Sequence, residues 1–128
     1  MFARMLSAEM KPIYREIDVE SPDIARVREL ILKMDGESID NVVIICQDNS
    51  EFHVGGGKSN EIIVSYENKD ESLNMISGTD TSEAELMAGG QAIVMERRFL
   101  IKKDEFIHFL EKFVKDKKES FANSQWEN

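Results

Sequence analysis

The stretch His53 to Ser59, HVGGGKS, comes nearest in this chain to a phosphate-binding loop. Such a loop reads Gly-x-x-x-x-Gly-Lys-Ser/Thr and leads from a strand into a helix, whose free N–H groups hold the phosphate. Phe52 stands where the first glycine is needed, and Glu61–Tyr66 is a β-branched and aromatic run that predicts a strand. We therefore interpret the glycines as a turn between strands. A nucleotide-binding domain or enzyme that uses Gly55–Ser59 and His53 is an alternative.

Few other residues could support catalysis or bind a metal. The chain has two histidines, His53 and His108, and one cysteine, Cys46, and none stands at metal-ligand spacing from another candidate ligand. No nucleophile elbow is present. Cys46 lies in an apolar run, which predicts a buried thiol and fits a reducing compartment, and His108 is expected to be partly buried on a helix. We expect no cofactor, no metal and no enzymatic activity.

The negative charge of the chain is unevenly distributed. The 128 residues include 25 acidic and 16 basic side chains, for a net charge of −9. Residues 37–101 hold twelve of the acids and four of the bases, whereas the segments on either side are almost neutral. An acidic surface repels nucleic acid and anionic lipid and attracts a basic protein. This distribution favours a basic protein partner and no direct contact with nucleic acid or membrane, although acidity also serves solubility.

The candidate binding surface consists of acidic residues on predicted turns and strand edges of the middle segment. They are Glu67, Asp70, Glu71, Asp80, Glu83 and Glu85. Carboxylates in such places can reach into a basic cleft and accelerate the encounter. High affinity also requires a packed anchor, because exposed ion pairs contribute little. Phe52, Tyr66 and Met75 are candidates for the anchor by position only, and the core is the favoured place for each.

Two helices are predicted near the ends of the chain. Ser21-Pro22-Asp23 is a helix start with Ser21 as the cap, and apolar residues then recur at helical spacing until Gly36. Asp104 is expected to cap a second helix that continues to about Lys118. Lys115, Lys117 and Lys118 would lie at its C-terminus, where cations suit the helix dipole.

Short strands with brief connections are predicted between the helices, beginning with an additional strand at 13–19. The others are 41–47, expected to be central and buried on both faces, then 51–54, 61–68 and 72–77. Residues 83–88 have two interpretations: a helix started by a capping box of Ser82 and Glu85, or a strand paired to 91–95 across Gly89-Gly90. We favour the strand, with Glu83 and Glu85 on its outward face. Residues 98–101 would extend it or form an edge strand.

These elements predict one α+β domain over residues 1–128, in which an antiparallel β-meander of five to six strands packs against an N-terminal and a C-terminal helix. We expect residues 1–12 and 117–128 to be less ordered. No apolar run approaches the roughly 20 residues of a membrane span, and the N-terminus is too charged for a signal peptide. A cytoplasmic location is therefore expected.

The order of several short motifs resembles a known family. A glycine triplet leads into a strand of the form x-x-Val-Ser-Tyr, and a second glycine pair followed by glutamine, an arginine-containing turn, a helix and a tryptophan come after it. These residues are Gly55, Gly56, Gly57, Ile63–Tyr66, Gly89, Gly90, Gln91, Arg97, Arg98 and Trp126. Residues 36–126 resemble the first-numbered family of immunity proteins from bacterial polymorphic-toxin systems, which are encoded beside contact-dependent growth-inhibition toxins.

The resemblance implies an α+β domain that binds a cognate toxin domain in the cytoplasm and blocks its active site. Such toxins commonly attack RNA or DNA, so their clefts tend to be basic. It further implies a monomer that forms a heterodimer with the toxin, glycines that are structural, and Trp126 packed on the sheet. Lys58-Ser59 and the missing aromatic–proline turn near Met95–Arg97 depart from the family pattern. A non-catalytic assembly subunit is a further alternative.

Overall fold

A computed structural model describes residues 1–128 and shows an α+β fold, as the sequence predicts. The helices are α1 (Ile24–Lys33), α2 (Lys103–Phe113) and α3 (Lys117–Ala122), with short 3-10 turns η1 (Lys58–Asn60) and η2 (Arg97–Phe99). The strands are β1 (Phe2–Glu9), β2 (Arg15–Glu20), β3 (Asn41–Cys46), β4 (Glu51–Gly56), β5 (Glu61–Glu67), β6 (Ser72–Met75), β7 (Glu83–Ala88), β8 (Gln91–Glu96), β9 (Ile101–Lys102) and β10 (Trp126–Glu127).

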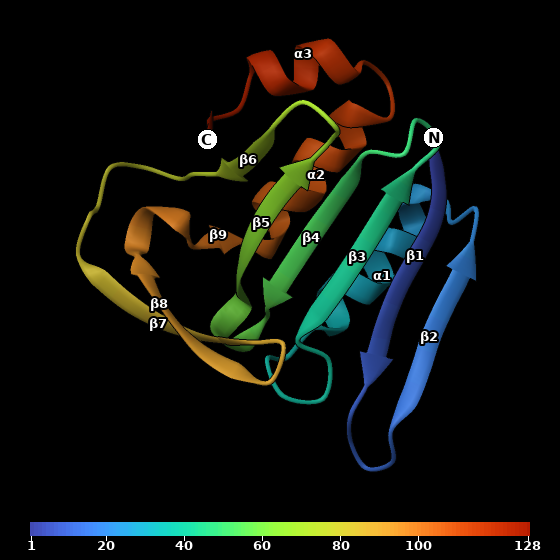
Figure 1. The fold of residues 1–128 in the computed structure, drawn as a ribbon, viewed down its shortest axis with the longest axis vertical. Helices are drawn as coiled ribbons and strands as arrows, with labels where there is room; N and C mark the ends of the chain where they lie inside the picture. Colours follow the sequence, from blue (N-terminus) through green and yellow to red (C-terminus); the bar gives the residue numbers. More distant parts are fainter.

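One antiparallel sheet of eight strands forms the centre of the molecule (Figure 1). Its order is β10-β6-β5-β4-β3-β1-β2, with β9 paired to β5, so β3 to β6 are the predicted meander. The sheet is larger than the five to six strands predicted, because β1 and β2 extend it beyond β3. The strands β9 and β10 have only two residues each, too few to show any periodicity.

Both ends of the chain, expected to be less ordered, carry regular structure. β1 lies inside the sheet between β2 and β3, and its Met5 is fully buried. A register shift between Phe2 and Arg4 separates the two buried residues of β1 by three positions, so the alternation that marks a strand is broken in the sequence. At the other end, Trp126 pairs with Met75 of β6 and packs against the core.

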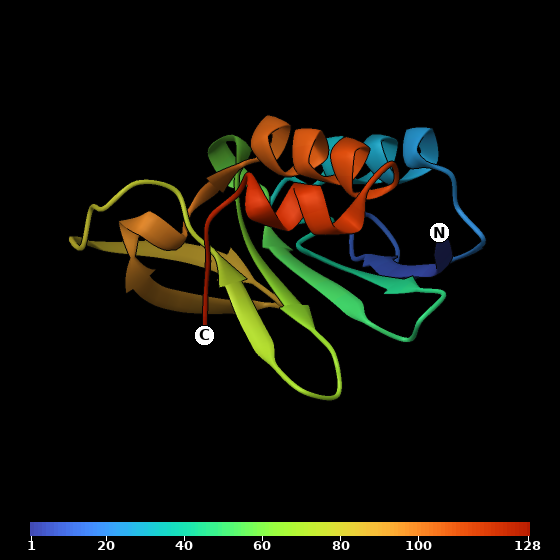
Figure 2. The same ribbon diagram turned by 90° about the horizontal axis from the view of Figure 1, so that it is seen from above.

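The helices α1 and α2 cover one face of the sheet (Figure 2). The core between these helices and the sheet is rich in aromatic rings, and Phe52 of β4 lies at its centre. The centroid of the Phe52 ring is 4.9 Å from that of Tyr66 and 5.1 Å from that of Phe113. Phe52, Tyr66 and Met75 are all buried in this core. None of the three is therefore available as an interface anchor.

The first helix forms where the sequence predicts it, but its N-cap is not the predicted residue, Ser21. Asp23 is the N-cap, and its carboxylate accepts the N–H of Arg26 at 2.8 Å. Ser21, the expected cap, has a φ of 46° and donates its N–H to the carbonyl of Ala3 at 2.9 Å. Ser21 therefore ends the β1–β2 ribbon and turns the chain toward α1.

The predicted second helix is two helices. Asp104 lies in the first turn of α2 and does not cap it, although its charge suits the helix dipole there. The chain leaves α2 before Lys115, and Asp116 caps α3 by accepting a main-chain N–H at 3.1 Å. Lys117 and Lys118 therefore begin α3 instead of ending α2, and an aspartate between lysines was the signal for this break.

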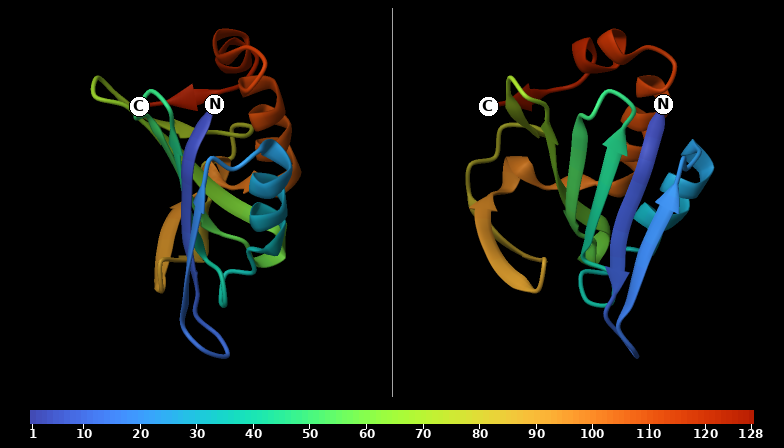
Figure 3. Two further views of the ribbon diagram at one scale, coloured as in Figure 1. Left: turned by 90° about the vertical axis from the view of Figure 1, so that its right-hand side faces the viewer. Right: turned by 45° about the vertical axis from the view of Figure 1, so that its right-hand side comes forward.

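The strand β3 is buried on one face only, contrary to the prediction. Val42, Ile44 and Cys46 point into the core, whereas Val43 and Ile45 are half-buried on the opposite face. The opposite face of the sheet carries no helices (Figure 3, left). Because apolar residues occupy both faces of β3, its sequence does not distinguish a covered face from an open one.

Residues 83–88 form a strand, so the capping-box helix is the wrong alternative. The turn between β7 and β8 has left-handed glycines, with φ of 60° at Gly89 and 78° at Gly90. The hairpin lies against the glycine-rich end of β4. A Cβ at Gly55 would be 2.9 Å from Ala88, and one at Gly56 would be 2.7 Å from Leu86. Because glycine has no side chain, the hairpin can pack closely at these two positions.

Candidate functional site

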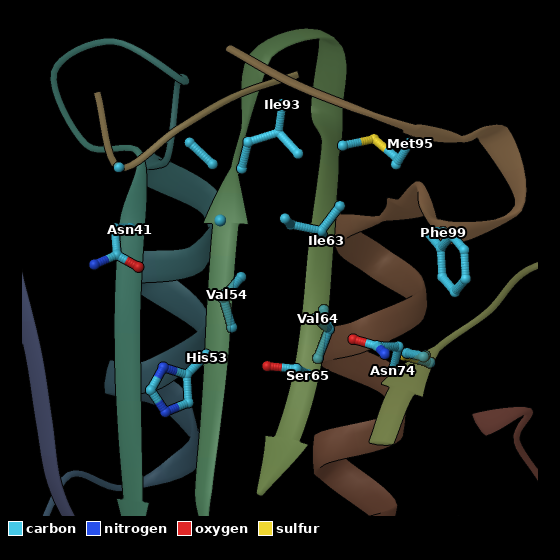
Figure 4. A pocket seen from close by; sticks show the side chains of 14 residues that line it. Asn41, His53, Val54, Ile63, Val64, Ser65, Asn74, Ile93, Met95 and Phe99 are labelled. Carbon is cyan, nitrogen blue, oxygen red and sulfur yellow. The ribbon is translucent and has the colours of Figure 1, made fainter. Parts of the chain in front are cut away.

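A groove lies between the open face of the sheet and the β7–β8 hairpin (Figure 4). Its cavity has a volume of about 460 Å³. His53, Ser65 and Asn74, from three neighbouring strands, form a polar row on its floor. A second hollow of about 540 Å³ continues past Gly89 at the hairpin tip, over β1 and β3. The hairpin is thus one wall of a long trough on the face that the helices leave open.

The strand register places the side chains of the open face in rows across the sheet, because residues paired in neighbouring strands share a face. One row is Glu20, Arg4, Ile45, Glu51, Glu67 and Ser72. The next is Asp18, Leu6, Val43, His53, Ser65, Asn74 and Glu127. The third consists of two pieces, Glu16 with Ala8 and Asn41 with Gly55 and Ile63. The open face therefore has an apolar centre between acidic sides.

Two carboxylates face each other on the open face, just beyond the His53 end of the groove. Glu51 and Glu67 are directly paired across β4 and β5. The Nε2 atom of His53 lies 3.1 Å from Glu51 and 3.3 Å from Glu67, so one imidazole bridges both carboxylates. Like charges directly opposite on a sheet are destabilising. The histidine partly relieves this repulsion when it carries a proton.

The other end of the groove is apolar. The hairpin residues Ala88, Ile93 and Met95 face Ile63 of β5 across it, and Phe99 of η2 closes the side. Ile63, Ile93, Met95 and Phe99 are each only half-buried, so an added apolar group would find uncovered surface there.

The six predicted acidic site residues do not form one surface. Glu67 lies just beyond the His53 end of the groove, and Asp70 and Glu71 lie nearby in the β5–β6 turn, at the opposite end of β5 from the hairpin. Glu83 and Glu85 are exposed on the outer face of the hairpin, as their alternation predicts, and so point away from the groove.

The sixth residue, Asp80, lies in the loop before β7. Its carboxylate accepts the Ser82 hydroxyl at 2.6 Å and the Ser82 N–H at 2.9 Å. These hydrogen bonds hold the pKa of Asp80 below its usual value. Asp80 therefore stabilises the conformation of the loop in which it lies.

Sequence reasoning missed the acids of β2 and one acid of β4. Glu16, Asp18 and Glu20 occupy alternate positions of a strand and lie on the open face. Glu51 pairs with Glu67 beside the groove. On the open face Asp18 forms an ion pair with Arg4 and Glu127 with Arg98, whereas no lysine or arginine pairs with Glu16, Glu20, Glu51 or Glu67. The period-two spacing of the β2 acids was the signal that could have found them.

The helical side of the molecule has the opposite balance. The helix α1 contains three basic residues and one acidic residue: Arg26, Arg28, Lys33 and Glu29. Across all three helices, seven residues are basic and five are acidic. The negative charge is therefore concentrated on the face that carries the groove.

The glycine run has the geometry of a packed turn. Gly56 and Gly57 have φ of 98° and 122°, and η1 leads directly into β5, so no α-helix N-terminus follows. This order lacks the helix that a phosphate-binding loop requires.

Other candidate chemistry is structural in character. Cys46 is buried as predicted, and burial raises the pKa of its thiol. His108 is exposed on α2, contrary to the expectation that it is partly buried. No three histidine, cysteine, aspartate or glutamate side chains are grouped so that they could hold a metal ion.

Comparisons with known proteins add no assignment to this geometry. Neither protein-family models nor curated proteins give a match to this chain. None of the three helices has the length and apolar character needed to cross a membrane.

Proposed function

We propose that this protein is an immunity protein, which binds a cognate toxin domain in the cytoplasm and occludes its active site. The observation that carries the proposal is the concentration of uncompensated carboxylates on one hollowed face of the sheet. Glu16, Glu20, Glu51 and Glu67 face the same side there, and none of them forms an ion pair with a lysine or arginine. Such a face is complementary to the basic cleft of a nucleic-acid-directed toxin.

The shape of the open face also favours a protein partner. Half-buried apolar residues, including Leu6, Val43 and Ile45, lie between the acidic sides of the sheet. A protein interface commonly has an apolar centre surrounded by polar groups. Charge then steers the encounter, and the apolar centre supplies the lifetime of the complex.

Co-expression tests this proposal directly. The proposal requires that a large secreted protein with a variable C-terminal domain is encoded immediately upstream, and an isolated metabolic operon there would contradict it. The chain is then co-produced with that C-terminal domain. We expect it to rescue cells from that domain and not from toxin domains of unrelated sequence, and to co-purify with it as a heterodimer. Growth arrest that persists despite abundant folded chain would refute the proposal.

A further inference from the structure

The groove changes its chemistry in steps along β4 and β5. The open-face pairs are Glu51 with Glu67 just beyond the cavity, then His53 with Ser65 and Gly55 with Ile63 within it. One end is therefore acidic, the middle polar and the other end apolar. Because a strand advances about 3.3 Å per residue, the four residues from Glu51 to Gly55 separate the two ends by roughly 13 Å.

The acidic end is unsatisfied in the free protein. Two opposed carboxylates share a single imidazole, and no lysine or arginine of the chain forms an ion pair with either of them. A guanidinium group offers a planar set of donors that can bind two carboxylates at once. An arginine from outside would therefore replace the bridge made by His53 and neutralise both Glu51 and Glu67.

The apolar end suits an aliphatic side chain. Ile93 and Met95 of the hairpin and Ile63 of the sheet leave surface that the chain itself does not cover. Burying a leucine-sized side chain there would favour binding, because it removes apolar surface of both partners from water. At Gly55 the hairpin residue Ala88 packs directly on the floor, so the uncovered apolar surface lies beside this contact, around Ile63, Ile93 and Met95.

We infer, resting on the proposed function, that the toxin is held through an extended segment lying along β4 and β5 in this groove. An arginine of that segment lies between Glu51 and Glu67, and an aliphatic residue four positions away lies under Ile93 and Met95. Side chains four apart in an extended segment point to the same side and are about 13 Å apart, which matches the groove.

The outer face of the hairpin is the competing surface. It carries Glu83 and Glu85 with the exposed Met87 and Val94, so it also combines acid and apolar groups. These four side chains lie on the face of the hairpin turned away from the groove, whereas Glu51 and Glu67 adjoin the His53 end of the groove. This outer face therefore supplies matched controls: Glu83 and Glu85 for the groove acids, and Val94 for its neighbour Ile93.

An NMR titration with defined peptides tests the inference without any toxin. The probes are acetyl-Leu-Ser-Thr-Ser-Arg-amide and its reverse, acetyl-Arg-Ser-Thr-Ser-Leu-amide, added to the 15N-labelled chain. We expect saturable shifts at the amides of His53, Ser65 and Ile93 with at least one peptide. Replacing the peptide arginine by glutamate should weaken binding at least tenfold.

Protein variants separate the two surfaces. We expect Glu51→Lys with Glu67→Lys to weaken peptide binding at least tenfold, and Glu83→Lys with Glu85→Lys to change it less than twofold. Ile93→Ser should weaken binding about fivefold or more, and Val94→Ser should not. Circular dichroism and thermal melting verify that each variant is folded. If one groove variant does not fold, the other groove variant and its control still test the inference.

Three results would overturn the inference. They are shifts centred on the outer face of β7, no saturable shift with either peptide, and undiminished binding by both the Glu51/Glu67 and the Ile93 variants. Failure of the proposed function can be distinguished from failure of this inference. A chain that binds the peptide but rescues no cell keeps the site and loses the immunity role, whereas undiminished rescue by both groove variants keeps the role and removes the site.

Discussion

Gly57 packs directly on the main chain of Met34, and a Cβ at position 57 would stand 2.5 Å from the Met34 carbonyl carbon. Met34 is the C-cap of α1, so this contact joins the turn between β4 and β5 to the end of the helix. The N–H of Gly57 donates to the Glu61 carbonyl at 2.8 Å and closes the turn. The third glycine of the run therefore serves close packing.

Gly57→Ala should be among the most destabilising single changes in the chain. The added methyl group would overlap main-chain atoms that cannot move away, and the φ of 122° is unfavourable for any residue with a Cβ. We expect a loss of about 3 kcal/mol or more in the free energy of unfolding, measured by urea titration. Gly89→Ala is the control, since a Cβ there would meet no atom within 4 Å, and its loss should stay near 1 kcal/mol. Equal losses at the two sites would contradict the packing role of Gly57.

The buried lysine of α2 satisfies the end of α1. The ammonium group of Lys103, only 5% exposed, donates to the main-chain carbonyls of Leu32 and Met34. The last carbonyls of a helix have no partner within the helix. Burial lowers the pKa of Lys103, yet its donors remain placed on these carbonyls.

Lys103→Met should lower the free energy of unfolding by about 2 kcal/mol, because it leaves buried carbonyls without a donor. Lys102→Met is the matched control, because that side chain is exposed and its ion pair with Glu61 spans 3.7 Å. We expect it to change stability by less than about 0.5 kcal/mol. Chemical denaturation of both variants checks the difference, and a Lys103→Met protein as stable as the wild type would show that the cap is dispensable.

The turn between β3 and β4 contains a carboxylate with a pKa well below its ordinary value. The hydroxyl and N–H of Ser50 donate to Asp48, at 2.5 Å and 3.0 Å, and the ammonium group of Lys117 donates to it at 3.0 Å. These bonds lower the pKa of Asp48 to about 2. A carboxyl whose pKa is lower in the folded state stabilises the fold above its unfolded value of about 4. That contribution is lost as the pH falls from about 4 to about 2.

Asp48→Asn should therefore destabilise the protein at pH 7, and the difference from wild type should shrink below pH 4 and vanish near pH 2. Urea titrations at a series of pH values measure this. Asp70→Asn, in the exposed β5–β6 turn, is the control and should change stability at pH 7 by less than about 0.5 kcal/mol. A difference between Asp48→Asn and wild type that stays constant down to pH 2 would show that the carboxylate is not held by these bonds.

The sequence predicts those parts of the fold whose signals are local. The meander from Asn41 to Met75, the helix after Asp23 and the hairpin around Gly89 each have a periodic pattern and a turn, and the structure confirms them. The sequence does not predict β1, because its bulge breaks the alternation of buried and exposed residues. Nor does it predict the break in the second helix, because Asp116 fits a helical pattern as one more charged residue.

The groove could be predicted only in part. Glu67 and His53 were singled out, but their neighbourhood depends on which strands pair and in which register, and pairing is a long-range property. Glu51 meets Glu67 only through the β4–β5 register, and the acids of β2 join the same face only because β1 intervenes between β2 and β3. The alternation of residues 83–88 predicts that the Glu83 side chain points outward. It does not predict how far Glu83 lies from the groove.

Leu86 is one of the side chains that hold the hairpin on the sheet. Leu86, 6% exposed, packs over Gly56 and forms a small cluster with Ala84 and Leu100, separate from the main core. At the tip, the N–H of Gly90 donates to the carboxylate of Asp40 at 2.7 Å. A small cluster held at two points should open without unfolding the whole sheet.

Leu86→Ala should loosen the hairpin while leaving the sheet intact. Loss of the side chain removes about 2 kcal/mol of packing, which would speed hydrogen exchange of the β7–β8 amides roughly 30-fold. Amides of β3 and β4 should exchange as in the wild type. Met87→Ala, one residue along on the exposed face of the same strand, is the control and should leave all rates unchanged. If Leu86→Ala accelerated exchange equally in β4 and β7, the hairpin would belong to the same cooperative unit as the core, and the groove wall could not move independently of the sheet.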